Sequence, residues 1–328
     1  METCLVTGGA GFIGSHVVDN LIAEGFKVVV LDDLSGGFED NVNPKAEFIN
    51  GSVVDHELVD KIFNDNKIDY VFHLAAYAAE ILSPHIRRFN YEVNLIGSVN
   101  LINNAVNHKV KCFVFTSSVG AYGNQKPPFD EETVPLPADP YGTSKYAIEI
   151  DLKNASDFFG LNYVIFRPHN VYGERQNLGD KYRNVLGIFM NQIMQGKKLT
   201  IFGDGEQTRA FSYIGDMAPI IAKSITTKDA QNEIFNIGAD QTYSVNQLAD
   251  EIMKAMGKTV EKNYLKTRHE VKHAYCSHDK IKKVFGEGTS TPLSEGIKKM
   301  ADWAKKAGIR ESKSFDNLEI KEGLPEGW

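Results

Sequence analysis

A tyrosine and a lysine stand four residues apart in the stretch YGTSK at residues 141–145. On a helix, residues with this spacing share a face, so the phenol of Tyr141 and the ammonium of Lys145 can point into one cleft. A free tyrosine has a pKa of about 10, and a nearby fixed cation favours the phenolate. The pair could supply a base near neutral pH, although the same spacing also occurs on solvated helix faces.

A glycine-rich stretch near the start of the chain indicates a second kind of chemistry. The letters GGAGFIG at residues 8–14 stand between an apolar run, Cys4 to Thr7, and an amphipathic segment, Ser15 to Glu24. This order predicts a strand, a glycine turn and a helix. Gly8, Gly11 and Gly14 let the backbone approach a pyrophosphate, whose charge is stabilised at the helix N-terminus.

An acidic residue follows the next predicted strand, as nucleotide binding through this turn requires. That strand, Lys27 to Leu31, ends at Asp32. A carboxylate there suits the two hydroxyls of an unphosphorylated adenosine ribose and repels a 2′-phosphate, which favours NAD over NADP. Asp33 could share the role, and a turn residue at the strand end is the plain alternative for Asp32.

Strand-like and helix-like runs then alternate along the first half of the chain. They are Glu47 to Asn50, a helix from about Asp55, Tyr70 to His73, a long helix from about Pro84 to His108, and Cys112 to Thr116. Such alternation predicts a parallel, doubly wound sheet whose ligands lie beyond the carboxyl ends of the strands.

Several polar residues lie at or near these strand ends. Ser117 and Ser118 follow one strand, and His73 ends another. His73 could act as a base, but a strand-end histidine before small apolar residues is more often structural. Asn94, on the long helix, could support the site or be a solvated helix residue.

The pattern changes after Pro168. The helix that carries Tyr141 runs to about Phe158, and Leu161 to Arg167 forms another strand. The segments beyond it no longer alternate regularly. We expect an α/β fold with a Rossmann-like doubly wound parallel sheet and a smaller, interleaved α/β substrate domain. The first unit would span residues 1–168, with later segments returning to it, and the second would be mainly 169–328.

Composition narrows the class of protein. A chain of 328 residues can bury two modest cores, and 42% apolar with 24% charged residues is ordinary for a globular protein. The formal charge of -7 has no basic tail, which argues against nucleic acid as a partner. No apolar run reaches membrane-spanning length, and the 3 cysteines include no Cys-x-x-Cys pair. We expect buried thiols, no metal site, no membrane partner and a cytoplasmic location.

Five motifs, taken in order, give a resemblance that covers nearly the whole chain. They are TGGAGFIGSH at Thr7 to His16, HLAA at His73 to Ala76, SS then AYG at Ser117 to Gly123, YGTSK at Tyr141 to Lys145, and QTRAFSYIGD at Gln207 to Asp216. The chain resembles the extended short-chain dehydrogenase/reductases. Within them it is most similar to the NAD-dependent nucleotide-sugar epimerases, the UDP-glucose 4-epimerases among them.

The resemblance implies a role for each matching position. Ser118, Tyr141 and Lys145 would be catalytic, with Lys145 also bonding the nicotinamide ribose. NAD would be bound by Gly8, Gly11, Phe12, Ile13, Gly14, Asp32, Asp33, Val53, Leu74, Ala75, Ala76, Asn94, Tyr141, Lys145 and Pro168. The nucleotide sugar would be bound by Ser117, Ser118, Tyr141, Asn170, Asn184, Val185, Arg209, Arg268 and Ala274.

The implied reaction is epimerisation at C4 of the sugar. Tyr141 would remove the proton of the 4-hydroxyl as the C4 hydride passes to NAD, leaving a 4-keto sugar that rotates and takes the hydride back on its other face. The protein would supply positioning and proton transfer, while the cofactor carries the redox step.

Three positions depart from the family pattern. Ser52 stands where many relatives have an aspartate near the adenine, and Ala78 stands where the closest 4-epimerases carry a lysine near the substrate. The segment at Arg268 is one residue shorter than the usual pattern. Ala274 matches a position where a large side chain closes the pocket at C2 of the sugar, so a small residue there would admit a 2-acetamido group.

The resemblance also separates related activities. Sugar 4,6-dehydratases carry an Asp-Glu pair where this chain has Ser117 and Ser118, and decarboxylating relatives carry a glutamate at the position of Gly120. The HNVYG stretch after Pro168 also resembles GDP-mannose 3,5-epimerase. That enzyme has its catalytic cysteine at the position where this chain has Gly120. Epimerisation at C4 is therefore favoured.

Other functions stay open at this level. The chain could be a reductase, or an epimerase acting at another carbon of a GDP-, dTDP- or CDP-sugar. A redox-sensing protein that binds NAD without turnover typically lacks the tyrosine or lysine, and both are present here. The base and the sugar are not fixed. Relatives are usually homodimers formed by two long helices of each subunit, here roughly Pro84 to His108 and Tyr141 to Phe158.

Overall fold

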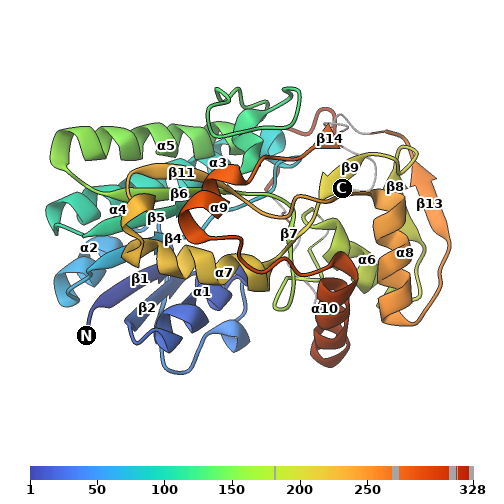
Figure 1. Ribbon diagram of the computed structural model, residues 1–328, viewed down its shortest axis with the longest axis horizontal. Helices are drawn as coiled ribbons and strands as arrows, with labels where there is room; N and C mark the ends of the chain where they lie inside the picture. Colours follow the sequence, from blue (N-terminus) through green and yellow to red (C-terminus); the bar gives the residue numbers. More distant parts are fainter. Residues whose placement is uncertain (181, 268–272, 310–314, 316, 325–328) are drawn as a thin grey trace.

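A seven-stranded parallel sheet forms the centre of the larger half of the molecule (Figure 1). The computed structural model describes residues 1–180, 182–267, 273–309, 315 and 317–324. The strands are β1 (Thr3–Thr7), β2 (Lys27–Asp32), β3 (Glu47–Asn50), β4 (Tyr70–His73), β5 (Cys112–Thr116), β6 (Tyr163–Pro168) and β11 (Glu233–Ile237). Their order is β11-β6-β5-β4-β1-β2-β3, and every neighbouring pair is parallel. The doubly wound Rossmann-like fold is confirmed, with the order reversing between β1 and β4.

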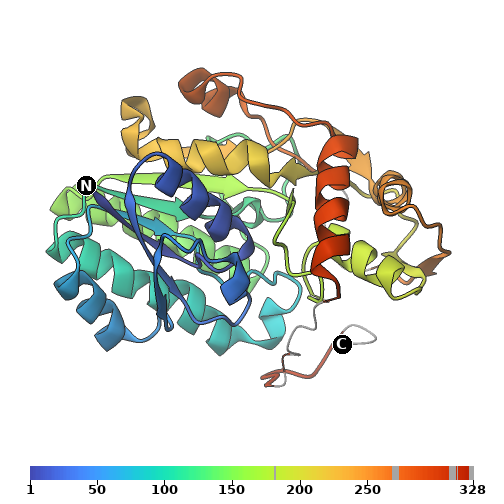
Figure 2. The ribbon, with the colours of Figure 1, turned by 90° about the horizontal axis from the view of Figure 1, so that it is seen from below.

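Helices cover both faces of this sheet (Figures 1 and 2). On one face lie α1 (Phe12–Ala23), α7 (Ile214–Lys223) and α9 (Asp279–Phe285), and on the other α2 (His56–Asp65), α3 (Arg87–Tyr91), α4 (Gly97–Asn107) and α5 (Pro140–Phe159). Successive residues of a strand face opposite sides, so Cys4 and Val6 pack with α1 and α7 while Leu5 packs with α2 and α4. Both faces are buried, which explains the nearly continuous apolar runs of the strands.

The boundaries of the site-bearing helices have local causes. Asp139 caps α5 by accepting a hydrogen bond from the amide of Gly142, and Pro140 occupies its first turn. Gly160 ends α5 in the left-handed conformation. The helix expected from about Pro84 instead begins at Arg87, because Ile86 has non-helical backbone angles and residues 83–85 form a 3-10 turn.

The second half builds a smaller unit with its own core. Its helices are α6 (Val185–Met194), α8 (Val245–Met256) and α10 (Leu293–Ala307). Its short strands are β7 (Val171–Tyr172), β8 (Leu199–Phe202), β9 (Thr208–Ala210), β10 (Ser212–Tyr213), β12 (Thr242–Ser244), β13 (Lys262–Leu265) and β14 (His273–Ala274). The three helices pack around one cluster of buried side chains that includes Phe189, Leu248 and Met300.

The two units are interleaved along the chain. From the second half of the sequence, β11 joins the large sheet as its edge strand and α7 and α9 pack on that sheet. The helices α6, α8 and α10 lie beyond its carboxyl end (Figures 1 and 2). No helix among the described residues is long and apolar enough to cross a membrane.

Candidate active site

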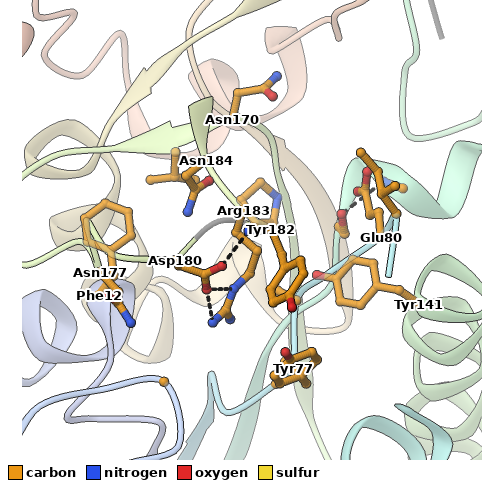
Figure 3. A pocket seen from close by; sticks show the side chains of 18 of the residues that line it. Phe12, Tyr77, Glu80, Tyr141, Asn170, Asn177, Asp180, Tyr182, Arg183 and Asn184 are labelled. Carbon is orange, nitrogen blue, oxygen red and sulfur yellow. Dashed lines mark hydrogen bonds and ion pairs between the residues drawn. The ribbon is translucent and has the colours of Figure 1, made fainter. Parts of the chain in front are cut away.

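One cavity of about 1550 Å³ brings together most of the residues predicted from the sequence. It lies beyond the carboxyl ends of the strands, where loops after β1, β2, β4 and β5 meet the second unit (Figures 1 and 3). The predicted residues that line it are Gly8, Gly11, Phe12, Ile13, Gly14, Asp32, Asp33, Val53, Leu74, Ala75, Ala76, Ser117, Ser118, Tyr141, Pro168, Asn170, Asn184, Val185, Arg209 and Ala274. Ser52 and Ala78 line it as well.

Three predicted residues are placed differently. Lys145 and Asn94 do not line the cavity, although both are buried directly behind it. Arg268 lies outside the described residues. Asn94 is not the solvated helix residue that the sequence left as an alternative, because its side-chain amide bonds both the backbone N–H (2.8 Å) and the carbonyl (3.1 Å) of Tyr77. It therefore holds the loop that follows β4.

The glycine turn fits a dinucleotide. A Cβ at Gly14 would lie 2.1 Å from the carbonyl oxygen of Gly8, and a Cβ at Gly8 would lie 2.7 Å from the backbone nitrogen of Ala75. Gly8 also has a φ of +73°, which favours glycine. The bare backbone thus faces the cavity at the N-terminus of α1, where N–H groups and the helix dipole attract a pyrophosphate.

Asp32 ends β2 beside this turn. Its carboxylate accepts hydrogen bonds from the backbone N–H of Ala10 (3.0 Å) and of Leu34 (2.8 Å). Burial raises the pKa of Asp32, and these hydrogen bonds act against that rise. Asp33 is exposed and bonds the backbone of Ser35 instead. Of the two carboxylates, Asp32 is the one held rigidly at the cavity wall.

Tyr141 and Lys145 form a buried pair with Ser118. The amine of Lys145 lies 5.9 Å from the centre of the Tyr141 ring and donates a hydrogen bond to the carbonyl of Thr116 at 2.8 Å. Burial lowers the pKa of Lys145 to about 7, while the charge of Glu149 acts in the opposite direction. The hydroxyl of Ser118 lies close enough to the phenol of Tyr141 to lower its pKa.

The expected lowering of the phenol pKa is wrong. Burial raises the pKa of Tyr141 well above its ordinary value, the charge of Glu80 raises it further, and the hydroxyl of Ser118 lowers it only in part. The phenol is therefore protonated at neutral pH. The lysine amine, in contrast, titrates near neutral pH.

A buried ion pair, which the sequence did not reveal as functional, lies behind the serines. Arg167 contacts Glu149 through two hydrogen bonds, Nη2 to Oε2 at 2.5 Å and Nε to Oε1 at 2.9 Å, and both side chains are 2% exposed. Ser117 donates a hydrogen bond to Glu149, and Tyr122 receives one from Arg167 at 2.7 Å. Glu149 follows Lys145 by one helical turn, and this spacing could have predicted from the sequence that its side chain lies on the same helix face.

His73 has the structural role that its sequence context favoured. Its ring nitrogens contact the hydroxyls of Thr7 and Ser98, each at 2.7 Å, and it does not line the cavity. Burial lowers its pKa to about 3, so the ring is neutral. The histidine ties β1 and β4 to α4 rather than acting as a base.

The structure adds charged and aromatic cavity residues that sequence reasoning missed (Figure 3). The charged and aromatic ones are Tyr77, Glu80, Asp180, Tyr182 and Arg183, and the amide of Asn177 lines the cavity with them. Glu80 comes close to the serine loop, since a Cβ at Gly120 would lie 2.9 Å from Glu80 Oε1 and 3.3 Å from Ser118 Oγ. The three-residue spacing of Asp180 and Arg183 was a weak indication of an ion pair.

Residues 4–238 match the model of the NAD dependent epimerase/dehydratase family. The chain belongs to this family. It is accordingly an NAD-dependent enzyme, and the predicted fold, family and cofactor are confirmed.

Both 4-epimerases and 4,6-dehydratases are among the similar proteins. A putative UDP-glucose 4-epimerase of Methanocaldococcus jannaschii is 39% identical over 304 residues, covering 92% of this chain and 98% of that protein. The structure of UDP-glucose 4-epimerase from Thermotoga maritima with UDP-glucose matches with a TM-score of 0.89 and 36% identity, covering 93% and 99% of the two chains. A dTDP-D-glucose 4,6-dehydratase of Mus musculus is 32% identical over 319 residues, covering 92% and 88%.

Proposed function

We propose that this enzyme epimerises a UDP-hexose at C4, with UDP-glucose and UDP-galactose or their N-acetyl forms as substrates. The observation that carries the proposal is the contact of Tyr141 with Ser118 and Lys145 at the wall of the cavity that also holds the glycine turn and Asp32. The UDP-glucose 4-epimerase names of its relatives support the same reaction.

The cofactor would lie along the first unit. Gly8, Gly11 and Gly14 present backbone to its pyrophosphate, and Asp32 accepts the adenosine ribose hydroxyls. When bound, NAD accepts and returns the hydride of C4. We also propose that residues 1–168 mainly serve the cofactor and 169–328 mainly the nucleotide sugar.

The proton of the sugar 4-hydroxyl would move through Tyr141. For Tyr141 to accept this proton its pKa must fall, and the ammonium of Lys145, 5.9 Å from the centre of the ring, would favour the phenolate. Ser118, which lies beside the phenol of Tyr141, would orient the 4-hydroxyl of the sugar toward that phenol. Ser117, held by Glu149, fixes the direction of the serine loop.

The second unit would hold the nucleotide sugar. Asn170 and Asn184 line the cavity with φ values of 40° and 62°, strained angles that asparagine tolerates better than most residues. Arg209 on β9 pairs in register with Ala274 on β14, so the proposed diphosphate and C2 positions are adjacent. Ala274 leaves space for a 2-acetamido group. We retain Arg268 as a proposed diphosphate ligand on the resemblance alone.

The position of Glu80 favours a second candidate function, 4,6-dehydration of the nucleotide sugar. A 4-keto sugar has acidic protons at its neighbouring carbons, and 4,6-dehydration requires a base for the one at C5. Glu80 places a carboxylate oxygen beside Ser118 and Gly120, from a different segment than the Asp-Glu pair of the dehydratases. A dTDP-D-glucose 4,6-dehydratase is also among the relatives.

We propose a cytoplasmic homodimer. Its interface would use α3 to α4 and α5, on which Ile96, Ile150, Phe158 and Phe159 are exposed apolar side chains. All three cysteines are free and buried, which suits a reducing compartment. Light scattering that gives only the monomer mass at all concentrations would remove the dimer.

The test is to purify the protein, identify the extracted dinucleotide, and incubate the enzyme with UDP-glucose and with UDP-N-acetylglucosamine. Proton NMR then follows C4 and C6 of the sugar. Inversion at C4 supports epimerisation, and loss of the C6 hydroxyl supports dehydration instead. Comparison with Ala274→Tyr tests the C2 pocket, since this variant should lose turnover of the acetamido sugar and keep that of UDP-glucose.

A further inference from the structure

The side chain of Arg183 spans the cavity from one unit to the other. Arg183 precedes α6 in the second unit, and its Nη2 and Nη1 atoms lie 3.5 and 3.9 Å from where a Cβ of Gly36 would be. Gly36 belongs to the loop between β2 and β3 on the cofactor side. Both residues line the cavity (Figure 3). The guanidinium thus faces the loop that follows Asp32.

Asp180 fixes the orientation of this guanidinium. Its Oδ2 accepts hydrogen bonds from Nε and Nη2 of Arg183, and its Oδ1 accepts one from the backbone N–H of Tyr182 at 2.8 Å. The carboxylate side chain is only 7% exposed and that of Arg183 is 20% exposed. A buried aspartate that holds one edge of the guanidinium leaves the N–H groups of the other edge directed elsewhere.

Tyr77 supports the flat face of the same group. The guanidinium carbon of Arg183 lies 5.2 Å from the centre of the Tyr77 ring. That ring packs against Phe89 at 5.2 Å and against Phe315 of the C-terminal segment at 5.6 Å. The backbone of Tyr77 is bonded to Asn94. Arg183 is therefore held by an ion pair on one side and an aromatic cluster on another.

The hydrogen-bonding capacity of Arg183 is not used up. A guanidinium has five N–H donors, and Asp180 engages only Nε and Nη2. Within the described part of the chain, Nη1 makes no hydrogen bond. The donors left over lie in a cavity whose proposed ligands, a dinucleotide and a nucleotide sugar, both contain a diphosphate. The planar fork of arginine matches phosphate oxygens better than any other side chain.

We propose that Arg183 binds the diphosphate of a nucleotide held in this cavity and so connects the cofactor loop at Gly36 with the second unit. The proposal rests on the proposed function, because it takes both ligands from there. The shared chemistry is a diphosphate linker, supplied by either the dinucleotide or the nucleotide sugar. Arg183 was not among the residues indicated by the sequence motifs.

Two binding measurements on the full chain separate these sources. The first is titration of NAD into protein freed of its cofactor, and the second is titration of UDP into the NAD-loaded protein, both by calorimetry. Arg183→Gln should weaken the NAD complex, the UDP complex or both by about tenfold to a hundredfold, the usual effect of losing a charge-assisted hydrogen bond. Arg183→Lys should recover only part of the loss because the fork is absent.

The same loop offers a matched control. Arg175 also pairs with an aspartate, Asp19, at 2.7 Å, but it does not line the cavity. Arg175→Gln should leave both dissociation constants within about twofold of the unchanged protein. If Arg183→Gln behaves like this control for both ligands, the proposal is overturned.

Removing Arg183 alone leaves the buried carboxylate of Asp180 without its cation, which could disturb the fold. The double variant Asp180→Asn with Arg183→Gln removes that charge. Weak binding by a double variant with the original unfolding midpoint supports a direct ligand contact. Recovery of both stability and affinity would instead assign the effect to Asp180 and overturn the proposal. Neither titration requires turnover, so a protein that binds through Arg183 but epimerises nothing would refute only the proposed function.

Discussion

Lys145 lies one helical turn after Tyr141, with its amine 5.9 Å from the centre of the tyrosine ring and bonded to the carbonyl of Thr116. Both side chains are almost fully buried. Burial disfavours the charged form of each, so it raises the pKa of the phenol and lowers that of the amine. Burial therefore favours the neutral form of both groups, and the main charge acting on the amine is that of Glu149.

Replacing Tyr141 by Phe should abolish turnover without loss of ligand binding. The ring stays in place and only the proton-transferring hydroxyl is lost, so we expect the rate to fall by about 10² to 10⁴-fold. NMR assays of turnover and calorimetry with NAD and UDP provide the measurement. Tyr146→Phe, on the same helix but away from the cavity lining, should keep full activity. Equal rates in the two variants would remove Tyr141 from the mechanism.

The low pKa of Lys145 predicts a pH dependence of stability. Burial lowers it from 10.5 to about 7, so between these pH values the unfolded chain binds more protons than the folded protein. The contribution of this group to the free energy of unfolding therefore rises with pH over that window and is constant below it. Urea unfolding of Lys145→Met should show a flatter pH profile there. Lys153→Met, an exposed lysine of the same helix, should keep the original slope.

Glu149 should contribute strongly to the free energy of unfolding and should hold the loop of Ser117 and Ser118 in place. Glu149→Gln leaves the buried cation of Arg167 without its partner, and breaking such a pair costs about 3 to 5 kcal/mol. Glu295→Gln is the control, because its pair with Lys299 is exposed to solvent and should contribute little to stability. Urea unfolding measures both. Similar losses in the two variants would show that the buried pair has no special weight.

The choice between Asp32 and Asp33 can be tested by nucleotide affinity. Asp32→Asn should weaken NAD binding by about tenfold to a hundredfold and reduce discrimination against NADP, since it removes the carboxylate next to the ribose. Asp33→Asn should change either affinity little, because that side chain is exposed and bonds Ser35. Titration of both cofactors into each variant decides between them. A larger loss of NAD affinity in Asp33→Asn than in Asp32→Asn would instead assign ribose binding to Asp33.

Much of the fold was predictable because its signals are local. The strands β3, β4 and β5 each end at the residue read from the sequence, and β4 and β5 are mainly apolar and buried. The motifs also led to the cavity, because parallel strands bring their carboxyl ends to one edge. Lys145 was predicted by spacing, but its position behind the cavity depends on how deeply α5 packs, which spacing does not reveal.

The residues that were missed depend on contacts between distant segments. Arg183 reaches Tyr77 and Gly36, and Glu80 reaches Gly120, across loops whose paths no periodic pattern describes. The pairing of Arg167 with Glu149 likewise requires β6 and α5 to be adjacent. Ile86, which delays the start of α3, has no sequence signal of its own.

The central claim is that the hydride of C4 leaves the sugar and returns to its other face. The most direct measurement is incubation of the enzyme with UDP-glucose that carries deuterium at C4, followed by NMR of the product. The account predicts the 4-epimer with deuterium retained at C4, formed about 10² to 10⁴-fold more slowly by Tyr141→Phe. Inversion with loss of deuterium to water, or a product changed at another carbon with C4 intact, would contradict it.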